Sequence, residues 1–139
     1  MLLASVVANG HAFYVYNTAR LSLCYQSRYI PDPILQIHLT PTAEVITRHA
    51  TQIMVWNKMH LVKKHQITAS QMLVIGHSLF LLNQAQLTII STNNDNARVV
   101  ELCTEMEGMM HPLSYLNKLV LWHRERLYLY NTECAKLVH

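Results

Sequence analysis

The sequence predicts an α+β fold in which a small antiparallel sheet is covered by helices. Apolar and polar residues alternate from Leu35 to Thr40, which is the period of a half-buried strand. After Thr40 the spacing of the apolar residues changes from that of a strand to that of a helix. One face of this helix would carry Val45, Ile46, His49, Ile53 and Trp56. A strand that leads directly into a helix N-terminus leaves unpaired backbone N–H groups at the junction. We therefore expect an anion or a partner's carboxylate to bind at this junction.

Composition favours one globular domain with its own core. Of the 139 residues, 51% are hydrophobic and 14% are charged, and the formal net charge is +3. This composition excludes a disordered chain, and the charge alone does not indicate nucleic acid or an anionic membrane. Three cysteines without zinc spacing suggest reduced thiols and a cytoplasmic protein. No apolar run approaches the roughly 20 residues of a membrane span.

The first 33 residues form an N-terminal extension before Pro31 and Pro33 break the chain. Asn9-Gly10 lies between two apolar runs, which is a strong signal for a β-hairpin. A single amphipathic helix from Leu3 to Tyr25 is the competing interpretation, although Gly10 would weaken it by about 1 kcal/mol. We expect a hairpin and leave the helix open.

A core over residues 34–110 follows. After the first strand and a helix to about Lys58, residues 60–67 are compatible with a short strand. Thr68 and Gln71 have the spacing of a capping box, which predicts a helix to about Asn83. A strand over 87–92 and a helix over 97–107, ended by Gly108, complete the predicted core.

Residues 111–139 read as one further helix, from Pro112 to Leu137. Apolar residues keep a 3-4 spacing along it, interrupted by His123. Such a helix either packs across the domain or forms a homodimer. The oligomeric state stays open at this point.

The order of these elements resembles the histidine-containing phosphocarrier protein, HPr, of the sugar phosphotransferase system. Residues 37–40 look like the first strand of that family, 47–53 like its first helix start, and 70–75 like the start of its second helix. Residues 87–107 are similar to its last strand and helix. The resemblance implies an HPr-like open-faced β-sandwich, with the N-terminal hairpin and the C-terminal helix as additions.

The resemblance also implies a binding surface at the strand–helix junction. Ile46 stands where the family carries its phosphoryl-accepting histidine, and His49 stands where the family has a proline. An isoleucine has no nitrogen to phosphorylate, so we expect no catalytic residue, no metal and no cofactor. The expected binding residues are Ile46, Thr47, Arg48, His49 and Ser70.

We therefore expect a non-catalytic regulatory protein that binds a protein partner, such as a phosphotransferase component or a regulator. One alternative is an active phosphocarrier that uses His49 or His38. Another alternative is a nucleic-acid-binding regulator, although a formal net charge of +3 gives this alternative little support. Its contacts would come from Arg48, Lys58, Lys63 and Lys64.

Overall fold

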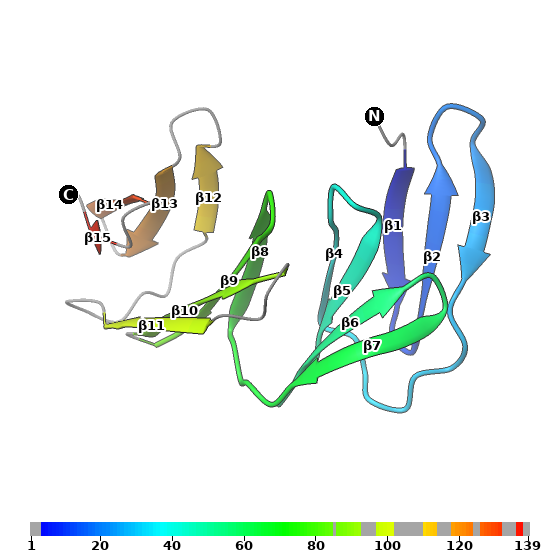
Figure 1. Cartoon of the computed structure of the whole chain (residues 1–139), viewed down its shortest axis with the longest axis horizontal. Helices are drawn as coiled ribbons and strands as arrows, with labels where there is room; N and C mark the ends of the chain where they lie inside the picture. Colours follow the sequence, from blue (N-terminus) through cyan, green and yellow to red (C-terminus); the bar gives the residue numbers. More distant parts are fainter. Residues whose placement is uncertain are drawn as a thin grey trace. The chain divides into compact units, whose positions relative to one another are not determined.

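The computed structural model describes residues 4–84, 86–92, 97–101, 110–113, 118–123, 126–131 and 136–137, with side chains for 8–84, 86–92 and 97–99. All regular elements in these ranges are β-strands, so the fold is all-β (Figure 1). The predicted α+β class and the HPr-like interpretation, including a phosphocarrier, are therefore wrong, because that fold needs helices over its sheet. Within the same ranges, no helix is long and apolar enough to cross a membrane.

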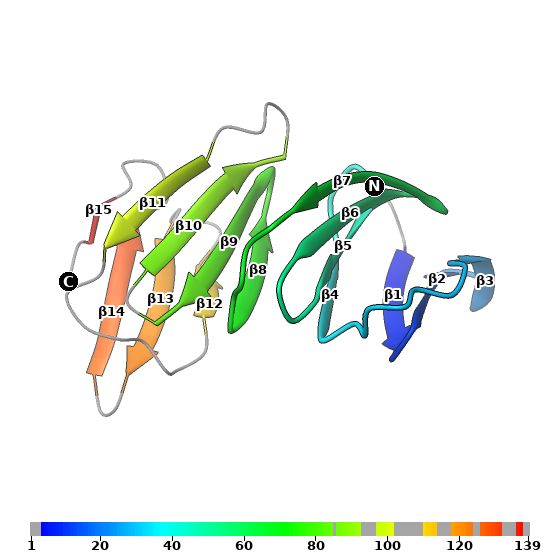
Figure 2. The same cartoon turned by 90° about the horizontal axis from the view of Figure 1, so that it is seen from below.

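The chain divides into two compact units, Met1–Ala69 (unit 1) and Ser70–His139 (unit 2). The two sheets of unit 1 have three and four strands, and the two sheets of unit 2 have four each. Within each sheet, consecutive strands pair antiparallel in chain order, as Figure 2 shows. Four-stranded meanders repeated along a chain are the blades from which β-propellers are built.

The strands of unit 1 run from the N-terminal hairpin to the turn before Ala69. The first sheet contains β1 (Ala4–Asn9), β2 (Ala12–Asn17) and β3 (Ser22–Gln26). The second contains β4 (Gln36–Leu39), β5 (Glu44–Arg48), β6 (Ile53–Asn57) and β7 (His60–His65). Strands β1 and β4 lie beside each other, so β3 and β7 are the outer strands of their sheets.

Unit 2 repeats this plan. Its first sheet contains β8 (Gln71–Ile75), β9 (Ser78–Asn83), β10 (Gln86–Ser91) and β11 (Ala97–Glu101). Its second contains β12 (Met110–Leu113), β13 (Lys118–His123), β14 (Arg126–Asn131) and β15 (Lys136–Leu137). Here β8 lies beside β12, as β1 lies beside β4 in unit 1.

The core of unit 1 lies between its two sheets. Phe13 of β2 meets Trp56 of β6 edge to face, with 5.6 Å between ring centroids. Aromatic pairs in this geometry stabilise a core beyond the area that they bury. The buried cluster around them is completed by Val15, Ile30, Ile34, Val45 and Met54.

The helix predicted from Pro41 to Lys58 is two strands, β5 and β6. Three consecutive residues of β5 and four of β6 are buried, so both faces of these strands contact the protein interior. A strand buried on both faces has no alternating pattern, and its apolar run imitates a helix face. Residues 49–52 turn the chain between the strands, where the N–H of His49 donates to the carbonyl of Gln52 at 2.8 Å.

The helix predicted from Thr68 to Asn83 is likewise two strands, β8 and β9. Gly76 between them has a φ of +58°, a left-handed conformation that a helix interior does not contain. The local capping-box pattern was overridden by tertiary strand pairing. Of the helix predicted over 97–107, residues 97–101 are β11, and residues 102–109 lie outside the described residues.

The long helix predicted from Pro112 to Leu137 is absent where the structure describes this region, which forms β12 to β15. Pro112 itself is paired with Leu119 across the β12–β13 ladder. The helical homodimer seam is therefore not formed. Residues 114–117, 124–125 and 132–135 lie outside the described residues.

Three predicted strands are present: β4 and β7 lie within the segments 35–40 and 60–67, and β10 overlaps the segment 87–92, beginning one residue earlier. Strands β1 and β2 pair around Gly10, whose φ is +56°. The unit boundary after Ala69 lies inside the segment 34–110 that sequence analysis treated as one core.

The two units also correspond in sequence. The turn Gly10-His11 in unit 1 matches Gly76-His77 in unit 2, and both glycines have left-handed φ angles. Both turns are followed by a strand that ends in Asn, at Asn17 and Asn83. In the second sheets, His49 matches His123, because each histidine is followed by a strand that ends in Asn, at Asn57 and Asn131. We infer that the chain contains the same two-sheet unit twice.

Candidate functional site

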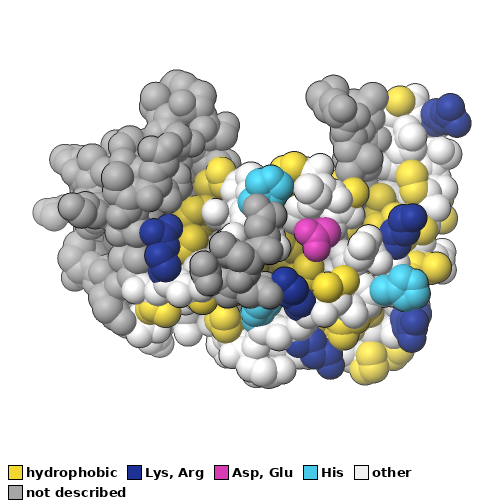
Figure 3. Space-filling model, in the orientation of Figure 1, with side chains coloured by type: hydrophobic (Ala, Val, Ile, Leu, Met, Phe, Trp, Pro, Cys, Tyr) yellow, Lys and Arg dark blue, Asp and Glu magenta, His cyan; other side chains and the backbone are white. Residues whose placement is uncertain are grey.

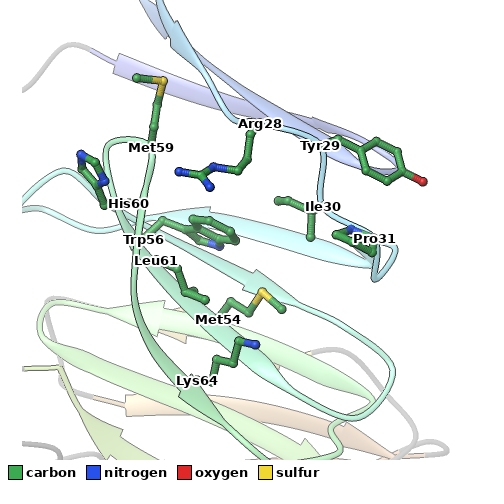
Figure 4. A pocket seen from close by; sticks show the side chains of 10 residues that line it. All are labelled: Arg28, Tyr29, Ile30, Pro31, Met54, Trp56, Met59, His60, Leu61 and Lys64. Atoms are coloured by element: carbon green, nitrogen blue, oxygen red, sulfur yellow. The ribbon is translucent and has the colours of Figure 1, made fainter.

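Unit 1 contains an open pocket of about 410 Å³ beside its second sheet (Figure 4). The segment that joins β3 to β4 forms one wall, and β6, β7 and their connecting turn form the other. The lining residues are Arg28, Tyr29, Ile30, Pro31, Met54, Trp56, Met59, His60, Leu61 and Lys64. The pocket, called the unit 1 pocket below, therefore combines apolar side chains with three basic ones.

A β-bulge between Val55 and Trp56 builds the apolar part of this pocket. Before the bulge, Met54 is paired with Lys64, and after it Trp56 is paired with Leu61 instead of Val62. Opposed residues on one face of a sheet lie close enough to pack against each other. The shift thus brings Met54, Trp56, Leu61 and Lys64 to the same wall, while Val62 lies outside the lining.

A chain of hydrogen bonds holds the side chain of Trp56 in place. Its indole Nε1–H donates to the Thr47 hydroxyl at 3.0 Å, and Thr47 Oγ1 lies 2.8 Å from His49 Nε2. His49 Nδ1 lies 3.0 Å from the carbonyl oxygens of both Asp32 and Pro33. Carbonyls only accept, so Nδ1 carries a proton and donates to this segment. The indole is therefore held in one orientation with 5% of its residue surface exposed.

The opposite wall is fixed by His11, which lies in the turn between β1 and β2. His11 Nδ1 donates to the Ile30 carbonyl at 2.8 Å, and the Ile30 N–H donates to the His11 carbonyl at 2.7 Å. The His11 ring also stacks on Tyr29 at 4.9 Å between centroids. Tyr29 is nevertheless 68% exposed, so it stands at the rim of the pocket with one face available. The two histidines together hold the connecting segment between both sheets.

The rim of the pocket is positively charged. Arg28, His60 and Lys64 line it, and no acidic side chain does. Among the described residues, the side chains of Arg28 and Lys64 make no hydrogen bond or ion pair. Figure 4 shows Arg28 and Trp56 among the side chains that line the pocket. These cations are therefore free to pair with an incoming anionic group.

The residues expected to form a binding junction occupy other places. Ile46 and Thr47 are fully buried in β5, and His49 is fully buried after it. Arg48 is held by the protein itself, because it donates to the Gln36 side chain at 3.0 Å and to the Ala69 carbonyl at 2.8 Å. Burial lowers the pKa of this guanidinium. The predicted carboxylate partner of Arg48 is thus replaced by neutral oxygens.

Ser70 lies ahead of β8 in unit 2, not at a helix start. Its hydroxyl and its N–H both donate to the carbonyl of Leu82, at 3.0 and 2.8 Å. His38, the other histidine considered for phosphoryl transfer, lies half-buried in β4 with Nε2 3.2 Å from the Gln36 amide.

Sequence analysis did not find the wall made by Arg28, Tyr29 and Trp56. The basic residues near the β6–β7 turn were visible as a cluster, and two of them, His60 and Lys64, line the pocket. The bulge that aligns Leu61 with Trp56 leaves no signal in the sequence. Among the described residues, no three His, Cys, Asp or Glu side chains group as metal ligands would.

Comparisons with known proteins support the all-β fold. The structure is similar to hydrazine synthase from Kuenenia stuttgartiensis, with a TM-score of 0.77 and 10% identity over 99% of this chain and 45% of that chain. It is also similar to BBS1N, solved in complex with ARL6DN, with a TM-score of 0.70 and 16% identity over 98% of this chain and 48% of that chain. This chain thus spans about half the length of both. No protein-family model and no curated protein matches the sequence.

Proposed function

We propose that this chain is a non-catalytic interaction module whose unit 1 pocket binds an acidic segment of a partner protein through an apolar anchor residue. The observation that carries this proposal is the pairing of a preformed apolar wall with unpaired cations at its rim. Binding surfaces of this kind place an aromatic or aliphatic side chain in a pocket and charged groups around it.

The charge distribution supports an acidic partner. Residues 1–69 contain six Lys and Arg but only two acidic residues, whereas residues 70–139 contain five and six. Both acidic side chains of unit 1 already have partners, since Asp32 accepts from Gln52 at 2.7 Å and Glu44 from Thr42 at 3.3 Å. Lys and Arg side chains appear over unit 1 in Figure 3, with little acidic surface near them. The excess of positive charge in unit 1 produces an electrostatic field that attracts anionic partners.

Two further points favour a protein partner over a nucleic acid. The pocket wall contains Met54, Trp56 and Leu61, and the indole N–H is already engaged by Thr47, so this wall suits an apolar side chain better than the polar edge of a base. One of the solved proteins with a similar fold is titled as a complex with ARL6DN. Repeated β-meanders also provide rigid scaffolds from which loops and pockets are presented.

A fluorescence-polarisation titration tests the proposal. The probe is a fluorescein-labelled peptide with Leu-Phe between pairs of glutamates, and the full chain is the titrant. We expect saturable binding that Lys64→Glu weakens about tenfold, because a rim cation becomes an anion. Lys58→Glu is the matched control, since it changes the net charge equally but lies outside the pocket lining.

The outcomes separate the alternatives. Loss of binding on replacing Leu-Phe by Gly-Gly supports an apolar anchor. Equal weakening by Lys58→Glu and Lys64→Glu would show a diffuse charge effect and contradict the pocket. Tighter binding of a single-stranded oligouridylate, with a steep dependence on salt, would replace the protein partner by nucleic acid.

A further inference from the structure

The first sheet of unit 1 lacks the fourth strand that the other sheets have. Its counterpart in unit 2 is the sheet β8 to β11, where β11 is paired with β10 from Gln86↔Glu101 to Ile90↔Ala97. In unit 1 the segment that follows β3 contains Pro31-Asp32-Pro33 and leads directly to β4. The backbone of this segment bonds to the β1–β2 turn instead of to β3, because the N–H groups of Ile30 and Ile34 donate to the carbonyls of His11 and Gly10. The outer side of β3 is therefore left unpaired by the described residues of the chain.

The edge of β3 has apolar side chains where its counterpart is buried. Leu23 of β3, which is paired with Tyr16, is 47% exposed, whereas Leu87 of β10, which is paired with Leu82, is fully buried. Leu21, in the turn just before β3, is 87% exposed. A bulge between Val15 and Tyr16 turns Leu23 toward the exposed Tyr16, so both lie on the outer face. An open strand edge with exposed apolar residues is a template for a further strand.

Charged residues that usually protect such edges are missing from β3. Its five residues, Ser22–Gln26, carry no Lys, Arg, Asp or Glu, whereas the outer strand β7 contains Lys63 and Lys64. Lysine on an outer strand discourages pairing with another chain. The contrast between the two outer strands of one unit indicates that β3 is left open to a strand.

We propose that β3 binds an extended segment of a partner protein as a fourth strand, and that this segment carries acidic residues at both ends of an alternating apolar stretch. Two exposed cations, Arg20 and Arg28, flank β3, and neither side chain has a hydrogen-bond or ion-pair partner among the described residues. Arg28 also lines the unit 1 pocket, so Arg20 is the cation that belongs to this edge alone. Acidic residues at the two ends of the added strand would pair with them. A second copy of this chain is a poorer occupant, because it would bring the same two arginines to the same edge.

The test uses a short fluorescein-labelled peptide in which valine and threonine alternate between glutamates at each end. A second peptide of identical sequence, N-methylated at every other residue, cannot form the ladder on its methylated edge. We expect the first peptide to bind the full chain and the second to bind at least tenfold more weakly. In hydrogen exchange, we expect the amides of residues 22–26 to slow on binding, while those of β7 stay unchanged.

Charge variants separate this edge from the unit 1 pocket. Arg20→Glu should weaken the strand peptide several-fold, and Arg98→Glu in β11 is the control with the same charge change. Lys64→Glu, which affects the pocket, should leave this peptide's affinity unchanged, so the two proposals can fail independently. Equal binding of the methylated peptide, or slowed exchange outside β3 only, would overturn strand addition. Concentration-dependent dimerisation that the peptide competes away would also overturn it in favour of a second copy.

Discussion

Units 1 and 2 have the same order of strands and the same Gly-His turns, but they differ in what they present. Unit 1 is the cationic half, and two of its histidines, His11 and His49, hold a connecting segment that completes a pocket. In unit 2, His77 occupies the place of His11 and is exposed, and Leu121 stands in place of Thr47. Leucine has no hydroxyl, so the Trp56–Thr47–His49 chain cannot be copied there. The scaffold is shared, and the proposed binding chemistry rests on residues of unit 1.

The largest expected effect comes from Trp56, which serves both the core and the pocket of unit 1. Replacing it by Ala removes the partner of Phe13 and the donor to Thr47. We expect a loss of about 3–5 kcal/mol in the free energy of unfolding, as for other buried aromatic residues. Urea denaturation followed by circular dichroism measures this. A loss below about 1 kcal/mol would mean that the two sheets of unit 1 do not share this core.

A matched pair compares the open first sheet of unit 1 with its covered counterpart. Leu82 of β9 is fully buried, whereas Tyr16 at the same position of β2 is 36% exposed. Leu82→Ala should cost about 2–5 kcal/mol of stability, and Tyr16→Ala clearly less. The same urea experiment decides between them. Equal costs would contradict the claim that the β3 side of the first sheet is open.

Replacing a histidine in each unit should change stability less than replacing these core residues. His49→Ala leaves the buried hydroxyl of Thr47 and the carbonyls of Asp32 and Pro33 without their partner. An unsatisfied buried polar group costs about 1–3 kcal/mol, so we expect a loss in that range. His77→Ala should change stability by less than about 0.5 kcal/mol, because this residue is exposed. Thermal unfolding of both variants tests the difference.

The smallest expected effect is at Ala43, which has a φ of 68° in the turn between β4 and β5. A left-handed conformation costs a non-glycine residue about 1–2 kcal/mol, so Ala43→Gly should stabilise unit 1 by up to about 1 kcal/mol. The predicted helix start at this position would give the opposite sign, since glycine weakens a helix. The direction of the shift in melting temperature therefore distinguishes turn from helix.

Sequence patterns located strands that are not buried along their whole length. The alternation before Thr40 and the β-prone run after Leu87 both correspond to strands, β4 and β10. Patterns failed where strands are buried on both faces, as in β5 and β6, because local spacing cannot show what packs on either side. The repeated Gly-His turn, followed by a strand ending in Asn, was the available signal for a duplicated all-β unit.

The candidate site was less predictable than the strands. The basic residues near Lys64 were visible, but their meaning depends on Arg28 and Trp56, which come from distant segments. His49 looked like an exposed reactive group, and only the fold shows it enclosed between Thr47 and the carbonyls of the connecting segment. Burial and long-range hydrogen bonding are tertiary properties, so neither could be inferred from spacing.

The most direct measurement of the central claim uses Trp56 as its own reporter. The chain has two tryptophans, so in a Trp122→Phe background Trp56 is the only one left. Titration with the glutamate-flanked Leu-Phe peptide should change the Trp56 emission saturably, and adding Lys64→Glu should weaken that response about tenfold. Emission that stays constant while the labelled peptide binds would place the binding site elsewhere and contradict the account.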